Sequence, residues 1–555
     1  GNFVYQIIKG LSLDVGFGVD YNNTQGKNFN QSLQTNQPSA SRTSNETIFL
    51  QNTNMLTYNR TFNDIHNIII TGVAEYQWQQ AESFGVTANV LLFPFLRYNN
   101  IVLANSYATT NNYTKSTIGS YIGRVNYNLL NRYLVTASIR SDRSSKFRGK
   151  NQTSVFPSVG IGWRISEEEF MQGVPVISNL KLRASWGQTG SQAVNVYGTV
   201  TSYNTAANVA ATSWLNGTLT SGINIGNPGN ENLKWETTTQ TNVGFDLGLL
   251  KDRFTLEADY FLKNTTDLLL SEPLPGYVGG GSIYRNVGAV RNSGFEFNLN
   301  ARVIERKNFS WNLNFNVSVL HNEVTDLGDN PFILTSGGAG AGMLTNPEMI
   351  LKPGYCISSY YGFKSLGIWQ VADAELAAKY GNQPGDYRYE DVNGDYAITG
   401  SDFQIIGSGM PKKVLGLNST LRYKNFTLNA FFQSMLDYGK WNFAYAQIMI
   451  AAANAREFTH RDILNRWSPD NPTSRVAAFS KTNVPRIQSS EYIESGNYLR
   501  LKNLSLQYAL PRNILKWGDL TAMVSAQNLF TITKYKGIDP ETYSNLGSGD
   551  QRGGD

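Results

Sequence analysis

Apolar and polar residues alternate along most of this chain with a period of two. In the segment that starts at Phe309, every second residue as far as Val319 is Phe, Trp, Leu or Val, and the residues between them are Ser or Asn. A period of two predicts β-strands, because successive side chains of a strand point to opposite faces. Several such segments run for about a dozen residues, whereas strands average about five or six. The pattern therefore favours one large sheet over a stack of soluble β-sandwich domains.

The polar face of these segments consists mainly of Asn, Thr, Ser, Gly and Gln. A membrane barrel produces this composition, because its apolar face contacts lipid and its polar face lines a wet lumen. The sequence contains about fifteen strong strand candidates. The first of them lie at Leu11–Tyr21 and near 47–60, 67–78, 116–128 and 133–146. We therefore predict an all-β fold, a transmembrane antiparallel β-barrel.

The segments that join the strands alternate between short and long. Tight links are predicted at 63–64, 128–131, 251–252, 305–308 and 424–425. Long segments are predicted at roughly 23–46, 79–115, 188–234, 266–285, 324–410 and 438–496. Outer-membrane barrels place short turns on the periplasmic side and long loops outside the cell, so we expect the long segments to be extracellular loops.

Some features within the long segments can be predicted locally. Arg456–Trp467 and Ala372–Tyr380 have the composition of short surface helices. The glycine clusters Gly279–Gly281 and Gly337–Gly342 predict flexible tips.

Composition narrows the possible functions. The single cysteine, Cys356, excludes an internal disulfide, and the three histidines are too far apart in sequence to give transition-metal spacing. The formal charge of +5 arises from scattered Lys and Arg residues without a basic run, so no nucleic-acid partner is predicted. The acidic run at 167–169 is typical of a solvated helix start rather than of acid-base catalysis. We predict that the protein is not an enzyme.

Residues 391–402 carry oxygen ligands at the spacing of a calcium loop. Positions one, three, five and twelve are Asp391, Asn393, Asp395 and Asp402, and the backbone carbonyl of Ala397 stands at position seven. Calcium prefers six to eight hard oxygens, so a structural calcium on an outer loop is predicted and no other cofactor is required. Position six is Tyr396 where an EF-hand loop has Gly, and position twelve is Asp rather than Glu. A plain Asn-Gly turn with solvated acids is the alternative.

Aromatic residues of the long segments form a second candidate site. Stacking on sugar rings or on peptide side chains of a cargo is the predicted role of Tyr203, Trp214, Tyr360, Tyr361, Trp369, Tyr396 and Trp441. Interfacial girdles and the cores of the loops also use Tyr and Trp, which is the alternative for each of them. Arg500 and Lys502 alternate with leucines, so they are predicted to point into the lumen.

Several segments carry a family resemblance. Segment 230–236 reads Asn-Glu-Asn-Leu-Lys-Trp-Glu, and segment 286–296 reads Asn-Val-Gly-Ala-Val-Arg-Asn-Ser-Gly-Phe-Glu. Gly-Asn-Tyr-Leu-Arg-Leu-Lys-Asn at 496–503 is followed by Gln-Asn-Leu-Phe-Thr at 527–531 and by Gly-Ile-Asp-Pro-Glu at 537–541. Together they resemble the TonB-dependent outer-membrane transporters, specifically the SusC-like (RagA-like) branch that imports glycans and peptides in Bacteroidetes-type bacteria. The first segment departs from that branch at Glu231, where Pro is usual.

The resemblance implies a 22-stranded barrel with a plugged lumen. Residues 1–555 would then be a partial barrel domain that holds strands seven to twenty-one, without the N-terminal plug, the first strands and the final strand. The start of the chain lacks an export leader and its end resembles a loop, which also predicts a piece of a longer protein.

The function that the resemblance implies is active import of a bulky nutrient, a glycan, an oligosaccharide or a peptide, across the outer membrane. TonB, ExbB and ExbD would supply energy through the missing N-terminal region, and a SusD-like lipoprotein would cover the long loops at 188–234, 324–410 and 438–496. Besides cargo and these proteins, the expected contact is outer-membrane lipid. A siderophore or cobalamin receptor is one alternative, and a secreted β-rich glycan hydrolase or adhesin is an alternative from another class.

Overall fold

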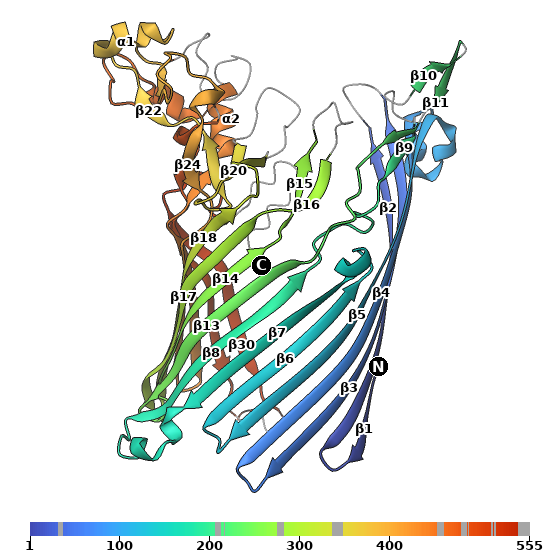
Figure 1. Cartoon of the computed structure of the whole chain (residues 1–555). Coiled ribbons are helices and arrows are strands. Elements are labelled where there is room, and N and C mark those ends of the chain that lie inside the picture. Colours follow the sequence, from blue (N-terminus) through green and yellow to red (C-terminus); the bar gives the residue numbers. More distant parts are fainter. Residues whose placement is uncertain are drawn as a thin grey trace. The chain divides into compact units, whose positions relative to one another are not determined.

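The computed structural model describes residues 1–31, 37–205, 212–215, 217–221, 223–274, 282–335, 348–451, 460–478, 486, 488–511, 514 and 518–541. Over these residues the chain is mainly β-strand (Figure 1). The expected glycine-rich tips at 279–281 and 337–342 lie outside the described residues.

Sixteen strands form the main sheet of the described chain, and each pairs with the next one in sequence order. The bounds are β1 (Asn2–Ile8), β2 (Leu11–Asn30), β3 (Ser39–Phe62), β4 (His66–Leu91), β5 (Ala104–Leu129), β6 (Tyr133–Ser144), β7 (Thr153–Arg164), β8 (Ile177–Ser191), β13 (Glu236–Leu249), β14 (Phe254–Thr266), β17 (Ala289–Arg306), β18 (Phe309–Asp326), β25 (Lys413–Tyr423), β26 (Phe426–Leu436), β29 (Tyr498–Ala509) and β30 (Thr521–Thr533).

The chain divides into two compact units. The first comprises residues 1–168, 183–241 and 265–287, and it contains β1 to β7, coloured blue to teal in Figure 1. The second comprises residues 169–182, 242–264 and 288–555, and it contains β17, β18, β25, β26, β29 and β30. Strands β8, β13 and β14 contribute residues to both units.

Residues of like polarity stand next to one another across the strands. In the first unit Val19 pairs with Leu50, and Leu50 pairs with Trp78. In the second unit an amide row crosses three strands, because Asn300 pairs with Asn314 and Asn314 pairs with Asn418. Asn314 Nδ2 donates to Asn300 Oδ1 over 2.6 Å. Register thus gives the sheet one apolar and one polar face, as the sequence predicted.

The predicted tight links are confirmed. In the β3–β4 link Asn63 and Asp64 both have positive φ, 51° and 54°. The β5–β6 link has two consecutive residues, Leu130 and Asn131, with φ of 55°. Two consecutive left-handed residues are the mark of a type I′ turn, whose twist matches that of the strands it joins.

Two predicted loops are wrong in their extent. The loop predicted at roughly 23–46 is largely strand, because β2 continues to Asn30 and β3 starts at Ser39. The loop predicted at 79–115 shrinks to residues 92–103 between β4 and β5. The end of β2 and the start of β3 have polar residues on both faces, so the period of two disappears there while the backbone pairing continues unbroken as far as Asn30 and Ser39. The strand count rises from about fifteen to sixteen because β1 pairs with β2 as a separate strand.

The long segments contain short strands of their own. Their bounds are β9 (Tyr203–Thr205), β10 (Thr212–Leu215), β11 (Thr218–Ser221), β12 (Ile223–Ile225), β15 (Leu269–Pro273), β16 (Ser282–Asn286), β19 (Ile333–Thr335), β20 (Glu348–Leu351), β21 (Ser359–Gly362), β22 (Ser365–Ile368), β23 (Tyr387–Tyr389), β24 (Gln404–Ser408), β27 (Gly439–Trp441) and β28 (Ile493–Ser495). Within the second unit, Figure 1 shows β20, β22 and β24 beyond those ends of β17 and β18 that lie opposite the β17–β18 turn.

The helices are short. The α-helices are α1 (Ala374–Lys379) and α2 (Phe443–Ala451), and the 3₁₀ turns are η1 (Pro94–Asn99), η2 (Ile101–Leu103), η3 (Gly149–Gln152), η4 (Ile165–Glu167), η5 (Glu169–Met171), η8 (Val371–Asp373), η9 (Gly400–Asp402), η11 (Arg461–Asn465) and η12 (Ser490–Tyr492). In the described ranges, none of them has the length and apolarity to cross a membrane.

The two helix predictions fare differently. The helix predicted at Ala372–Tyr380 is confirmed by η8 and α1. The helix predicted at Arg456–Trp467 is wrong over its described part, where only the 3₁₀ turn η11 forms, and residues 456–459 lie outside the described chain. Helix α2 was not predicted.

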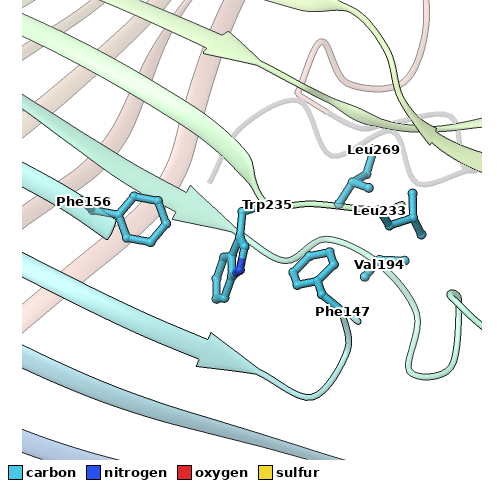
Figure 2. Packing of buried hydrophobic residues seen from close by; sticks show 6 residues of the cluster. All are labelled: Phe147, Phe156, Val194, Leu233, Trp235 and Leu269. Atoms are coloured by element: carbon cyan, nitrogen blue, oxygen red, sulfur yellow. The ribbon is translucent and has the colours of Figure 1, made fainter. Parts of the chain in front are cut away.

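A hydrophobic cluster in the first unit explains the segment Asn-Glu-Asn-Leu-Lys-Trp-Glu at 230–236 (Figure 2). The cluster consists of Phe147, Phe156, Val194, Leu233, Trp235 and Leu269. The Trp235 ring lies 5.3 Å from the Phe147 ring and 5.8 Å from the Phe156 ring, measured between centroids. Trp235 Nε1 donates to the Gln152 carbonyl over 3.2 Å, so its one polar group is satisfied in the buried position.

The same segment is anchored by polar contacts to the β15–β16 hairpin. The Asn286 side chain accepts from Lys234 N over 2.9 Å and donates to the Lys234 carbonyl over 2.8 Å. Glu236 Oε1 accepts from Leu269 N over 2.7 Å, and Lys234 Nζ lies 3.0 Å from Asp267 Oδ1. Residues 230–236 therefore hold β6, β7, β13 and the β15–β16 hairpin together.

We expect Trp235→Ala in the full-length protein to lower the free energy of unfolding by about 3–5 kcal/mol, the usual cost of truncating a buried Trp. Urea unfolding of the detergent-solubilised protein measures the change. Trp186→Ala is the control, because Trp186 is 39% exposed and fills no buried cluster. Equal losses in the two variants would contradict a special role for this cluster.

Candidate functional site

The predicted calcium loop is an ordered polar loop. Asp391 Oδ1 accepts from Gly394 N over 2.7 Å, and its Oδ2 accepts from Tyr396 N over 3.0 Å. Asp395 Oδ1 accepts from Ala397 N over 2.8 Å, and Asn393 Oδ1 accepts from Asp395 N over 3.1 Å. The oxygen-bearing side chains at positions one, three and five thus shape the loop by binding its backbone N–H groups.

The Asp402 side chain joins the end of the loop to its start. Its side chain is completely buried, Oδ1 accepts from Val392 N over 2.9 Å, and Oδ2 accepts from Thr399 N over 2.8 Å. Tyr396 takes the left-handed conformation, with φ of 61°, at the position where an EF-hand loop has glycine. That departure in sequence is therefore no obstacle to the turn.

The charge of Asp391 is favoured by the loop. Partial desolvation raises the pKa of Asp391, but hydrogen bonds from the N–H groups of Tyr396 and Gly394 and from the Tyr380 hydroxyl outweigh it and lower the pKa below its usual value. In the described ranges, no group of three or more His, Cys, Asp or Glu side chains has metal-ligand geometry. The hydrogen bonds between side chains and backbone in this loop are also those expected of the alternative, a plain Asn-Gly turn.

Trp441 and Tyr360 lie in a hydrophobic cluster of the second unit, between β27, α2 and η12. Its buried members are Trp441, Ala446, Met449 and Tyr492, and Tyr360 packs on it from β21. Trp441 is 8% exposed, so its ring is a core residue of the loops. Burial also raises the pKa of the Tyr360 hydroxyl.

Trp369 and Tyr361 belong to the neighbouring part of the same unit. Trp369 is 2% exposed, and the Arg388 guanidinium stacks 4.5 Å from the centre of its ring. The centres of the Tyr361 and Phe403 rings lie 5.5 Å apart, with the rings edge to face. Phe403 in turn packs on the buried cluster of Phe363, Ile368, Tyr387, Tyr389 and Trp467. These placements match the loop-core alternative for Trp369 and Trp441.

The other predicted cargo residues have more open positions. Tyr203, at the start of β9, is 65% exposed, and Tyr396 is 49% exposed. The centres of the Tyr380 and Tyr396 rings lie 5.4 Å apart, and Lys379 Nζ lies 5.6 Å from the centre of the Tyr396 ring. Trp214 pairs with Leu219 in the β10–β11 hairpin, and its side chain lies outside what the structure describes. Tyr203 belongs to the first unit and Tyr396 to the second.

Sequence reasoning missed an exposed apolar surface between β4 and β5. Its members Leu92, Phe93, Phe95 and Val102 are 58%, 48%, 77% and 75% exposed. The sequence signal for this surface is the apolar run Leu-Leu-Phe-Pro-Phe-Leu at 91–96, within the segment predicted to be a loop. Since β4 has 26 residues and would extend over roughly 85 Å, this surface lies beyond an apolar band about 25 Å tall. An apolar surface in that position is typical of a protein interface.

Arg500 and Lys502 have carboxylate partners that the sequence did not reveal. Arg500 is 3% exposed, and its guanidinium lies 2.6 Å from Asp539 Oδ1 and 2.8 Å from Glu541 Oε2. Lys502 Nζ lies 2.5 Å from Glu541 Oε2, and the Tyr498 hydroxyl donates to Glu541 Oε1 over 2.7 Å. Segment 534–541 after β30 is thereby tied to β29.

Lys440 extends this charge network to β27. Its ammonium group donates to the carbonyls of Asp539 and Pro540 over 2.9 and 2.8 Å. The sequences 496–503 and 537–541 are therefore two halves of one contact.

Comparison with known proteins gives consistent matches. The family model described as "TonB dependent receptor-like, beta-barrel" matches residues 2–529. TonB-dependent receptor P3 of Formosa agariphila is 34% identical over 558 residues, which cover 97% of this chain and 53% of that protein. TonB-dependent receptor SusC of Bacteroides thetaiotaomicron is 32% identical over 443 residues, which cover 78% of this chain and 42% of SusC.

The structural comparison agrees with the sequence comparison. The RagAB peptide transporter structure matches with a TM-score of 0.82 at 25% identity, covering 97% of this chain and 58% of that chain. This chain therefore spans about half the length of the curated relatives it matches.

We expect Arg500→Met to destabilise the full-length protein by about 1.5–3 kcal/mol, because it removes the buried guanidinium that binds the partly exposed carboxylates of Asp539 and Glu541. It should also release segment 534–541, so that trypsin cleaves after Lys534 and Lys536 faster than in the wild type. Limited digestion followed by mass spectrometry measures the cleavage. Lys413→Met is the matched control, since the Lys413–Asp437 pair is exposed and such pairs contribute about 0–1 kcal/mol. Unchanged cleavage in Arg500→Met would show that the network does not hold the segment.

Proposed function

Because this chain belongs to the TonB-dependent receptor β-barrel family, we propose that it forms part of an outer-membrane importer for a bulky nutrient. The chain is a transmembrane antiparallel β-barrel protein of the bacterial outer membrane, of the SusC-like branch. The proposed cargo is a glycan, an oligosaccharide or a peptide. The observation that carries the proposal is the match to SusC, and to a RagAB structure described as a peptide transporter, across most of this chain.

Two features of the chain itself support import. The amide row of Asn300, Asn314 and Asn418 gives the sheet a wettable face, which suits the passage of a polar cargo. The described parts of the long segments at 327–412 and 437–497 fold on hydrophobic cores of their own. They therefore offer surfaces of defined shape, which cargo recognition requires.

The proposed partners follow from the same branch. A SusD-like lipoprotein would cover the long segments, and the exposed residues Leu92, Phe93, Phe95 and Val102 supply a suitable apolar contact. TonB, with ExbB and ExbD, would supply the energy through parts of the protein beyond this chain. We propose that the protein moves its cargo without breaking bonds in it.

We expect cells that lack the gene to lose growth on at least one polysaccharide or peptide mixture, and the full-length gene to restore it only when TonB is active. A growth panel with single polysaccharides, peptide mixtures and ferric chelates measures this. A defect confined to iron limitation with chelates would favour the siderophore receptor alternative. Cleavage of a polysaccharide by the purified protein would favour the hydrolase alternative.

Tyr203 and Tyr396 are the predicted cargo residues with exposed rings, so we propose that they stack on the cargo. Each contact of this kind contributes about 0.5–1.5 kcal/mol, so the double variant Tyr203→Ala, Tyr396→Ala should weaken cargo binding about tenfold. Titration of the full-length protein with the nutrient identified by the growth panel measures the affinity. Tyr423→Ala is the control, because this 55% exposed tyrosine lies at a tight turn. Equal affinities of the double variant and the control would contradict the assignment.

We propose separately that residues 391–402 bind a calcium ion. The support is the spacing of Asp391, Asn393, Asp395, Asp402 and the Ala397 carbonyl, together with the left-handed turn at Tyr396. Each carboxylate oxygen that accepts one N–H group retains a lone pair for a cation. The ion would fix the loop without taking part in transport.

We expect calcium at a hundred times its dissociation constant to stabilise the protein by about 2.7 kcal/mol relative to protein in EGTA. Thermal unfolding of the full-length protein measures this, and isothermal titration gives the dissociation constant. Asp395→Asn should abolish the response, because it removes a charged ligand, whereas Asp329→Asn in another turn should preserve it. A wild-type protein without calcium heat has the plain turn instead.

A further inference from the structure

The apolar face of the first unit contains a groove of about 580 Å³. Ligand sites usually have volumes of roughly 300–1,000 Å³. The side chains that define the groove are Leu13, Asn54, Leu56, Tyr121, Ile139 and Val155, which come from β2, β3, β5, β6 and β7. Neither the predicted function nor the loop clusters use this surface.

Two glycines that face each other make the groove. Gly72 of β4 pairs directly with Gly123 of β5, and both line it. Neither has the positive φ that only glycine adopts readily. A Cβ atom on Gly72 would have no heavy atom within 4 Å, and one on Gly123 would only touch Ile139 at 3.7 Å. Since the backbone would accept larger residues at both positions, the notable effect of the two glycines is the open space itself.

The groove faces the hydrocarbon of the membrane. Gly72 lies seven residues beyond Ile65 of the β3–β4 turn, which corresponds to roughly 16 Å of height for a strand tilted by about 45°. The apolar band of such barrels is about 25 Å tall, so the groove is inside it. The opposite face of the same strands is polar, and there the Arg140 guanidinium binds the Asp142 carboxylate over 2.8 Å.

Two residues of the lining, Asn54 and Ser141, have polar side chains, and Asn54 is hydrogen-bonded to Asn52. Asn54 Nδ2 donates to Asn52 Oδ1 over 2.7 Å, and Asn52 Nδ2 donates to the Gly16 carbonyl over 3.1 Å. The side-chain N–H groups of Asn54 and Asn52 thus bind acceptors of the sheet itself. Within the described part of the chain, no donor reaches Asn54 Oδ1. A hydrogen-bond acceptor at the lipid face is costly unless something donates to it.

We propose that this groove binds a hydroxylated acyl chain of an outer-membrane lipid. The hydrocarbon lies over Gly72 and Gly123, and the chain hydroxyl donates a hydrogen bond to Asn54 Oδ1. The groove is continuous with the surface that contacts lipid, so an acyl chain reaches it without leaving the membrane. The inference depends on the outer-membrane location and not on what the protein transports.

A second copy of the chain fits this surface less well. Tyr121, Ile139 and Val155 beside the glycines are 71%, 55% and 50% exposed, so they project from the wall. A neighbouring sheet would rest on these side chains and leave the floor of the groove empty. A single flexible chain can lie between them.

Native mass spectrometry of the full-length protein tests the proposal. The protein is delipidated and then exchanged with lipids that carry either tetradecanoyl or 3-hydroxytetradecanoyl chains. We expect the wild type to retain the hydroxylated lipid preferentially. Gly72→Leu should lower retention at least about tenfold, the effect of losing contact with a few methylene groups.

Two further variants make the result specific. Gly119→Leu is the matched control, because Gly119 lies on β5 four residues before Gly123 and on the same face, a Cβ there would have no heavy atom within 4 Å, and it does not line the groove. It should retain lipid as the wild type does. Asn54→Leu should bind both lipids equally, because the acceptor is gone.

Three outcomes would overturn the proposal. Equal lipid retention by the wild type and Gly72→Leu would show that the groove is not the binding site. If Asn54→Leu still preferred the hydroxylated lipid, the proposed hydrogen bond from the chain hydroxyl to Asn54 would be excluded. A dimeric wild type that Gly72→Leu converts to a monomer would assign the groove to an interface between copies.

Discussion

The structure depends on one constraint, the pairing of backbone N–H and C=O groups where water cannot satisfy them. In hydrocarbon each unpaired group costs several kcal/mol, so a chain that crosses as strands must pair them in register. The described strands follow this rule, with β3 paired residue by residue to β4 from Ser39 to Phe62. Once register is set, every side chain is assigned to the lipid face or to the polar face. The amide row and the groove beside Gly72 are both consequences of that assignment.

Pairing also carries the sheet beyond the membrane. Strands β2 to β5 have 20 to 26 residues, more than the roughly 9–11 that a bilayer needs. Outside the membrane, water reaches both faces and the apolar alternation is no longer required. The exposed residues Phe93 and Phe95 are presented at the end of this extension.

The long segments are organised by a different force. In the parts that the structure describes, they lack the continuous ladder of the main sheet and are held by small hydrophobic cores such as the one around Trp441 and Tyr492. Charged and polar contacts then attach distant pieces of chain, as Arg500 does with Asp539 and Glu541. Aromatic residues in these segments are therefore divided between scaffolding and surface. Burial distinguishes Trp369, at 2% exposed, from Tyr203, at 65% exposed.

The sequence by itself determined the fold class, the tight turns and the apolar face, because these depend on the local period of two and on turn residues such as Asn63 and Asp64. It did not determine where β2 ends and where β3 begins, since the residues there are polar on both faces and only cross-strand pairing shows that they belong to strands. Nor did it distinguish buried from exposed aromatics in the long segments, or join Arg500 to Asp539. Gly72 and Gly123 are 51 residues apart in the chain, and only the pairing of β4 with β5 places them opposite each other. These contacts are long-range, and tertiary structure alone brings their partners together.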